Sequence, residues 1–505
     1  MKVNQLLKCL AAAALLVSCT QKAEYEFAAY YENLPFPMDK VERPVIPSYT
    51  VDLTDFGAVG DGVTLNTEAF ASAMQHLSSK GGGHLNVPAG IWLTGPITIL
   101  SNIDLHVTHD AIILFSTDRS LYPIINTVFE GLDTKRCESP VNADGAKNIS
   151  ITGGGVIDGA GDDWRPLKKN KVSQPYWDNK VANGGIVVGQ MWYPDEGFIQ
   201  GARGAAMNVP ADGADFDNIK SFLRPVLVSI RNCENVLLED CLFQNSPAWN
   251  LHPLMSKNII INNVTVRNPE YSQNGDGIDV DSCENVLIVN STFDCGDDGL
   301  CIKSGKDADG RRRARPCQNL IISGCTVYHG HGGFVVGSEM SGGVHNIKVS
   351  DCRFLGTDVG LRFKANRGRG GVVDGIWIEN IYMTDIVSEA VLFNLYYNGS
   401  NSADRLIDGE IVKGEDIPMP VDETTPAFRD IHVNNVVCNG ANQAMLFKGL
   451  PEMPVKGIDI SNCTITSRKG IELSWSEDVT LRNTKVVSTE GEPVILHKVT
   501  NYTRE

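Results

Sequence analysis

The chain has 505 residues, and its 61 acidic and 44 basic side chains give a formal net charge of −17 at pH 7. Hydrophobic residues make up 42% and charged residues 21% of the chain, which is the composition of a folded protein. Such an acidic chain lacks the basic surface that phosphate backbones require, so we expect no nucleic-acid partner. Binding of a polyanion would require a local cluster of cations.

The N-terminus has the layout of an export signal. Lys2 and Lys8 precede an apolar run over residues 10–17, which is too short to span a bilayer. The run ends in Leu-Val-Ser-Cys at Cys19, which resembles the lipobox of bacterial lipoproteins. We therefore predict a signal peptide over residues 1–18, lipidation of Cys19 and a polar tether over residues 19–47. The expected location is the envelope of a Gram-negative-type bacterium, in the periplasm or on the outer-membrane surface, with the lipid as the only membrane anchor.

Residues 48–505 are predicted to form one catalytic domain, which begins with a helix over residues 67–77. Asn66 stands at the position of an N-cap. The apolar side chains of this helix share one face, which would cover the first coil of a solenoid. They are Phe70, Ala73, Met74 and Leu77.

A repeat follows, and it determines the predicted fold. Each copy has a turn residue, an aliphatic, any residue and another aliphatic, with a Cys or a substitute six positions after the start. Short alternating strands broken by Gly, Asn and Asp cannot bury their apolar face alone, so the copies must stack. We predict an all-β, right-handed parallel β-helix with a short N-terminal capping helix. The copies start at Asn148, Asn235, Asn258, Asn285, Asn319, Asn346, Gly375, Asp430, Gly457 and Asp478.

Eleven cysteines remain after Cys9 and Cys19 are set aside, and several occupy the repeat position. This pattern favours buried free thiols over a disulfide framework, although a bridge between Cys295 and Cys301 stays open.

The repeat is interrupted from Asp163 to about residue 221. We predict that this stretch is an insertion around residues 160–220. Its aromatic side chains form either a wall of a cleft or a packed side structure.

Four segments of the repeat region align on a glycine, at Gly277, Gly299, Gly333 and Gly360. Residues after each glycine alternate between the core and the outer face. Equivalent positions on successive coils stack about 4.8 Å apart. The alignment therefore gathers side chains of opposite charge on one outer face. They are Asp276, Asp297, Asp298, His331, Arg362 and Lys364.

Stacked carboxylates repel one another, and repulsion raises the pKa of one member. Such a cluster suits glycosidic cleavage, where one carboxyl group must be protonated while another stays ionised. The motifs resemble those of the polygalacturonase family, which are Asn-Thr-Asp, Gly/Gln-Asp-Asp, Gly-His-Gly and Arg-Ile-Lys. Here they read Asn274-Gly275-Asp276, Gly296-Asp297-Asp298, Gly330-His331-Gly332 and Arg362-Phe363-Lys364, so the middle residue departs at Gly275 and Phe363.

The resemblance implies single displacement with inversion at the anomeric carbon. Asp297 would be the general acid, Asp276 and Asp298 would hold and deprotonate the attacking water, and His331 would tune the acid. Arg362 and Lys364 would bind a galacturonate carboxylate. No cofactor or metal is expected.

Other residues are candidates for substrate binding, but each of them also has a possible structural role. Asn274 is a contact or a turn former, and His252 lies one coil before Asp276. Lys303 is a second carboxylate contact or a partner of Asp281. The arginines at 311–313 and 315 are a solvated loop or attract polyanions, and Arg367 and Arg369 are similarly open.

We therefore expect a monomeric hydrolase of α-linked galacturonate in pectin, with exo action favoured because the loops at 160–220 and 303–317 can close the cleft. An endo-polygalacturonase and a rhamnogalacturonan galacturonidase remain alternatives. A pectate lyase, whose Asp cluster would hold Ca²⁺, and a non-catalytic carbohydrate-binding β-helix are the less favoured readings.

Overall fold

A computed structural model describes residues 25–397, 405–407 and 410–505. The chain divides into two compact units, residues 1–35 and 36–505. The described part of the first unit holds one short 3-10 turn, η1 (Ala28–Tyr31). The predicted signal peptide and Cys19 lie outside the described residues. Within the described ranges, no helix has the length and apolar character needed to cross a membrane.

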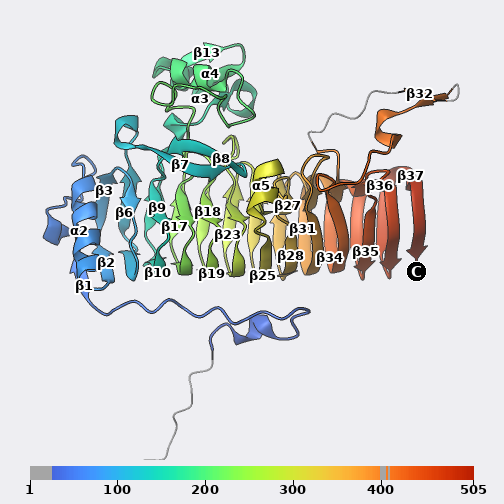
Figure 1. Cartoon of the computed structure of the whole chain (residues 1–505), viewed down its shortest axis with the longest axis horizontal. Helices are drawn as coiled ribbons and strands as arrows, with labels where there is room; N and C mark the ends of the chain where they lie inside the picture. Colours follow the sequence, from blue (N-terminus) through green and yellow to red (C-terminus); the bar gives the residue numbers. More distant parts are fainter. Residues whose placement is uncertain (1–24, 398–404, 408–409) are drawn as a thin grey trace, which may run out of the picture. The chain divides into compact units, whose positions relative to one another are not determined.

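The second unit is a parallel β-helix, as predicted, with its strands stacked in sequence order (Figure 1). Each coil contributes one strand to each of three parallel faces. Face 1 contains β1 (Thr50–Asp52), β2 (Gly83–Val87), β5 (Ile103–Val107), β10 (Lys147–Thr152), β16 (Glu234–Glu239), β19 (Lys257–Asn262), β22 (Glu284–Val289), β25 (Cys317–Ser323) and β28 (Val344–Ser350). Face 2 contains β3 (Gly90–Thr94), β6 (Ala111–Phe115), β11 (Val156–Asp158), β17 (Leu242–Gln244), β20 (Thr265–Arg267), β23 (Thr292–Cys295), β26 (Thr326–His329) and β29 (Arg353–Leu355).

Face 3 carries the predicted site. It contains β4 (Ile97–Thr98), β9 (Val141–Asp144), β15 (Val228–Arg231), β18 (Leu251–Leu254), β21 (Ile278–Asp281), β24 (Asp298–Lys303), β27 (Gly332–Gly337) and β30 (Leu361–Lys364). The last coils have longer continuous strands, and β31 pairs with strands of all three faces. These are β31 (Val372–Asn394), β34 (Ala427–Lys448), β35 (Val455–Ser461), β36 (Thr464–Arg482) and β37 (Lys485–Arg504), with β32 (Arg405–Ile407) and β33 (Glu410–Val412) as a small antiparallel pair.

The first residue of every repeat copy has a left-handed backbone, with φ between 52° and 65°. Asn, Asp and Gly tolerate this conformation best, which explains why they occupy the position. The asparagines also form a ladder from coil to coil. Asn258 Nδ2 donates to Asn235 Oδ1 at 3.1 Å, and the pattern continues through Asn285, Asn319 and Asn346.

The residue six positions later points into the core. Cys241, Cys325 and Cys352 are all fully buried there. All eleven cysteines of the described residues are free and buried, so the prediction of free thiols is confirmed, and Cys295 and Cys301 form no bridge.

The capping helix α2 (Thr67–Ser79) buries the predicted apolar face against the first coil. Asn66 is the N-cap residue, as predicted, but its side chain makes no capping hydrogen bond. Its Oδ1 instead accepts from Val59 N at 2.8 Å, and its Nδ2 donates to Thr64 O at 2.8 Å. The side chain is used to close the loop that precedes the helix.

Part of the predicted tether packs on the β-helix. Phe36 lies against Trp377 with ring centroids 5.5 Å apart, and Val41 is 1% exposed. Arg43 donates to both carboxylate oxygens of Glu239, at 2.6 and 2.8 Å. The two apolar side chains explain why residues 36–47 are held against the coils.

The predicted insertion lies between β11 and β15. It contains α3 (Gln174–Ala182), α4 (Glu196–Ala202) and an antiparallel sheet of β12 (Leu167–Lys168), β14 (Met191–Tyr193) and β13 (Ile186–Val188). Trp177 and Trp192 pack together in one cluster, and Trp164 packs with Phe198 in another. These aromatic side chains are therefore packed, and they join the insertion to neighbouring segments, since Trp164 also packs on Tyr122 with ring centroids 5.2 Å apart.

A β-hairpin that the sequence analysis missed, β7 (Ile124–Phe129) and β8 (Leu132–Cys137), extends over face 3 toward helix α5 (Asp307–Arg313) (Figure 1). Phe129 stacks on Trp249 at 4.8 Å, just before β18. At the tip, Gly131 O accepts from Lys306 N at 3.1 Å and from Arg313 Nη2 at 2.5 Å. We call this hairpin, together with α5, the roof.

Candidate active site

The register of face 3 agrees with the predicted alignment. Ile278 lies opposite Leu300, Leu300 opposite Phe334, and Phe334 opposite Leu361. All four side chains belong to the core. Because side chains alternate along a strand, the residue after each of them faces outward. Asp298 is paired with Gly332, which places Asp297 beside His331 on the neighbouring coil.

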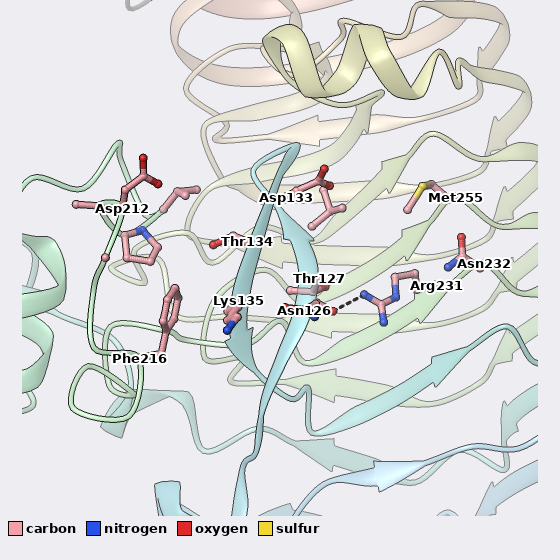
Figure 2. A pocket seen from close by; sticks show the side chains of 15 residues that line it. Asn126, Thr127, Asp133, Thr134, Lys135, Asp212, Phe216, Arg231, Asn232 and Met255 are labelled. Atoms are coloured by element: carbon pink, nitrogen blue, oxygen red, sulfur yellow. Dashed lines mark hydrogen bonds between the residues drawn. The ribbon is translucent and has the colours of Figure 1, made fainter.

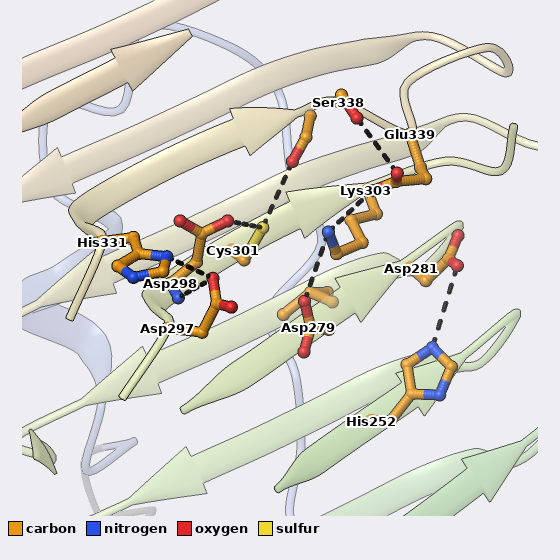
Figure 3. A network of polar contacts seen from close by, with 12 residues as sticks. His252, Asp279, Asp281, Asp297, Asp298, Cys301, Lys303, His331, Ser338 and Glu339 are labelled. Carbon is orange, nitrogen blue, oxygen red and sulfur yellow. Dashed lines mark hydrogen bonds and ion pairs between the residues drawn. The ribbon is translucent and has the colours of Figure 1, made fainter. Parts of the chain in front are cut away.

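Three carboxylates converge at the start of these strands. One carboxylate oxygen from each of Asp276, Asp297 and Asp298 lies within 4.8 Å of the others. Asp276 and Asp298 are 3% and 1% exposed, whereas Asp297 is half-buried. The separation is shorter than the roughly 6.5–9.5 Å typical of inverting glycosidases, as stacking on adjacent coils requires. Figure 3 shows Asp297 and Asp298 with His331 beside them.

The carboxylates do not share one electrostatic environment. Burial raises the pKa of Asp276 well above its ordinary value, and the charges of Asp297, Asp279 and Asp298 raise it further. Burial acts on Asp298 in the same direction, but Lys364 and Arg362 outweigh it and hold its pKa well below the ordinary value. The pKa values of two neighbouring carboxyl groups are thus moved in opposite directions, which is the kind of separation that acid–base catalysis uses.

His331 is placed to orient Asp297. Its Nδ1 lies 3.0 Å from Asp297 Oδ1, and this hydrogen bond raises the pKa of His331. The same Asp297 oxygen accepts from Asp298 N at 3.0 Å. Asp297 thus keeps one orientation with its other carboxylate oxygen outside these bonds.

The two predicted cations lie next to the carboxylates. Lys364 Nζ is 2.6 Å from Asp298 Oδ2, and Arg362 Nη1 is 3.2 Å from Asp298 Oδ1. The ring of Tyr397 lies 4.9 Å from Lys364 Nζ and 5.5 Å from the Arg362 guanidinium carbon. Sequence reasoning missed Tyr397 because no motif marks it.

Asn274 forms the turn before Asp276. Its φ is 55°, and its Oδ1 accepts from Arg224 Nη2 at 2.8 Å. Both departures from the family motif have a local cause. A Cβ on Gly275 would lie 1.8 Å from Ser272 Oγ, and Phe363 faces the core, where it stacks on Phe393 at 4.5 Å.

His252 and Lys303 lie in a buried charged layer behind the carboxylates (Figure 3). Lys303 Nζ pairs with Glu339 Oε2 at 2.8 Å and with Asp279 Oδ1 at 3.5 Å. The alternative that Lys303 pairs with Asp281 is therefore wrong. His252 Nε2 lies 3.8 Å from Asp281 Oδ2. Contact of His252 and Lys303 with substrate stays a prediction.

The predicted arginine loop is structured, and its arginines hold loops. Arg311 Nη1 donates to Gly368 O at 2.7 Å, and Arg312 Nη2 pairs with Asp133 at 2.7 Å. Arg369 Nη1 pairs with Asp307 at 2.5 Å, and Arg367 Nε with Glu452 at 2.7 Å. The predicted solvated loop is thus partly helical, in α5, and Arg311 and Arg313 reach neighbouring segments, whereas Arg312 and Arg315 are exposed as expected.

A pocket of about 610 Å³ lies beside the hairpin and away from this site (Figure 2). Its lining includes Lys135 and Phe216, with Arg231 held by Asn126 O at 2.8 Å. None of the three carboxylates lines it.

Comparison with known proteins agrees with this geometry. Residues 212–420 match the family described as glycosyl hydrolases family 28. The chain is 30% identical over 440 residues to a protein named "Probable polygalacturonase" from Vitis vinifera, covering 85% of this chain and 77% of that protein. It is 29% identical over 365 residues to the exo-poly-alpha-D-galacturonosidase of Dickeya chrysanthemi, covering 70% of this chain and 58% of that protein.

Solved structures show the same fold. The exopolygalacturonase of Thermotoga maritima superposes with a TM-score of 0.71 and 33% identity, covering 88% of this chain and 94% of that one. A family 28 exopolygalacturonase of Yersinia enterocolitica gives a TM-score of 0.68 at 23% identity, covering 90% of this chain and 78% of that one. Together with the site, these similarities establish a glycoside hydrolase.

Proposed function

The chain belongs to glycosyl hydrolase family 28, and from that premise we propose that it removes α-linked galacturonate from the ends of pectic chains with inversion. The observation that carries the proposal is the cluster of Asp276, Asp297 and Asp298 beside two cations. The carboxylates supply acid–base chemistry, and Arg362 and Lys364 supply positive charge for a uronate on an otherwise acidic protein.

In the proposed reaction, Asp297 donates a proton to the glycosidic oxygen as the bond from that oxygen to the anomeric carbon breaks. Ionised Asp298 takes a proton from a water whose oxygen attacks the same carbon from the opposite side, and Asp276 helps to hold that water.

Exo action is supported by the roof. The hairpin tip is tied to α5 by Gly131 O, and Asp133 pairs with Arg312 at 2.7 Å. This bridge joins the hairpin to the helix that follows β24, and we propose that it stops a long chain from continuing past that end of the site. The Dickeya and Thermotoga relatives are also named as exo-acting enzymes.

The test is a timed digest of homogalacturonan and rhamnogalacturonan oligosaccharides. We expect one short product from the earliest time point, without a ladder of intermediates. A ladder would contradict exo action, and an unsaturated product absorbing in the ultraviolet would indicate a lyase. Lyase chemistry is less favoured, because a bound Ca²⁺ would need the negative charge of Asp298. Lys364 and Arg362 already neutralise that charge.

We also propose that Cys19 carries the lipid that attaches a monomeric enzyme to the cell envelope. The motif Leu-Val-Ser-Cys before the tether supports this. Cys19→Ala should move the protein from the membrane fraction to the soluble fraction. Unchanged fractionation would contradict the anchor.

A further inference from the structure

The turn that carries Asp276 is held by residues outside the four motifs. Arg224 is 1% exposed and lies at the end of the insertion, just before β15. Its Nη1 donates to Gln273 O at 3.0 Å and to Pro247 O at 3.0 Å. Its Nη2 donates to Asn274 Oδ1 at 2.8 Å. One guanidinium therefore binds two consecutive residues of the turn, Gln273 and Asn274.

The same turn is connected to the hairpin through the insertion. Asn208 Nδ2 donates to Glu130 Oε1 at 2.5 Å and lies 3.3 Å from Asn274 Oδ1. Glu130 is 3% exposed at the hairpin tip. Arg136 of β8 completes the connection, with Nη1 donating to Asn208 O at 2.7 Å and Nε donating to Arg224 O at 3.0 Å. The hairpin, the insertion and the catalytic turn are thus joined by one buried network.

Arg224 has no carboxylate within ion-pair distance among the described residues, although its charge is buried. Burial lowers its pKa to about 9, and the carboxylate of Asp276 acts in the opposite direction. A buried cation without an ion pair is costly. Its hydrogen bonds all serve turns of face 3 and the insertion, which indicates a role in holding that geometry.

Resting on the proposed function, we propose that Arg224 is a positioning residue, which with Asn208 fixes Asp276 through the turn Gln273–Asp276 and makes the roof part of the catalytic geometry. The two terminal nitrogens of the Arg224 guanidinium bind Asn274 Oδ1 and the Gln273 carbonyl at the same time. The single ammonium nitrogen of a lysine cannot reproduce this planar arrangement of donors. Removing the roof should therefore reduce turnover as well as change the products.

The test compares Arg224→Lys with Arg165→Lys, assayed on oligogalacturonides. Arg165 is a matched control, since it is 3% exposed, belongs to the same insertion and binds Asn245 Oδ1 at 2.8 Å, one coil from the catalytic turn. We expect Arg224→Lys to lower kcat at least tenfold with KM within twofold. Arg165→Lys should lose similar thermal stability while kcat stays within twofold. Equal kcat for both variants, or losses that follow only the folded fraction, would overturn the proposal.

Asn208→Ala serves as the milder variant if Arg224→Lys fails to fold, and it should lower kcat in the same way. A crystal structure of Arg224→Lys gives a readout that does not depend on activity. Displacement of the Asp276 carboxylate relative to Asp297 supports the proposal, and an unmoved carboxylate overturns it. If the wild-type protein itself does not hydrolyse oligogalacturonides, that result would contradict the proposed function and not the role of Arg224.

Discussion

At the level of single residues, the protonation of the cluster is decided by neighbours and not by the carboxylates themselves. Asp276 and Asp298 are equally buried, yet their pKa values move in opposite directions, because Lys364 and Arg362 contact only Asp298. The motifs identified all three carboxylates, since each lies at a fixed offset from an aligned glycine. The direction in which each pKa is moved depends on contacts that no linear pattern contains.

Asp297→Asn should lower kcat by roughly 10²–10⁴-fold, the range lost with a general acid. The side chain is half-buried on the outer face, so the midpoint of thermal unfolding should move by only a few degrees. Steady-state assays and a melting curve check both parts. Turnover close to that of the wild type would refute the assignment of Asp297 as the acid.

Lys364→Met should shift the acid limb of kcat/KM to higher pH, because Asp298 loses the cation that most lowers its pKa. The same contact also makes the stability of the wild type depend on pH. The pKa of Asp298 is lower in the folded than in the unfolded chain, so its stabilisation is present above about pH 3.9 and is lost as the pH falls through the folded pKa. Lys364→Met removes much of this stabilisation, so the variant should be less stable than the wild type at neutral pH and should lose less of its stability as the pH falls through this range.

Lys364→Arg keeps the charge and serves as the control for that pH profile. Its acid limb should stay near that of the wild type even if KM changes. If Lys364→Met shows the wild-type limb, Asp298 is not the group whose ionisation limits activity at low pH.

At the level of elements, the sequence predicted the strands that recur in every coil but did not predict elements that occur only once. The ten repeat copies predicted the strands of the coils, and the insertion was visible as a gap between copies. The hairpin of β7 and β8 was missed, although Glu130-Gly131 between two alternating runs is a signal for a two-residue turn. Its contact with α5 joins segments about 175 residues apart, which no local pattern shows.

Opening the roof should change the products. In the double variant Arg312→Ala/Arg313→Ala, the hairpin tip loses its ion pairs with Asp133 and the bond to Gly131 O. We expect longer oligogalacturonides among the early products, with kcat reduced less than fivefold because the Glu130–Asn208 contact remains. The measurement is product separation over time.

Arg315→Ala is the control, since Arg315 is exposed in the same segment and should leave the product pattern unchanged. A product pattern in the double variant identical to that of the wild type would show that the bridge does not close the cleft.

At the level of the whole molecule, stacking explains both stability and function. The left-handed turns and the asparagine ladder from Asn235 to Asn346 keep these coils in register, and the register brings the three carboxylates together. The fold was therefore predictable from spacing alone. The packed course of residues 36–47 was not, because it depends on single apolar contacts with distant coils.

The ladder predicts a graded loss of stability at Asn285. Asn285→Ala should cost about 2 kcal/mol, from the strain of a left-handed Ala and the lost ladder hydrogen bonds. Asn285→Gly loses the same bonds but tolerates the backbone conformation, so it should cost about half as much. Urea unfolding measures both, and equal losses would rule out backbone strain as the cause.

The most direct measurement of the central claim is the anomeric form of the first product, followed by proton NMR during hydrolysis of an oligogalacturonide. The short separation of the carboxylates makes this informative, since distance alone does not decide the stereochemistry. Attack by a water held between Asp276 and Asp298 predicts the β-anomer first, which then mutarotates. Appearance of the α-anomer first would mean that a carboxylate and not a water attacks the sugar, and would contradict the mechanism.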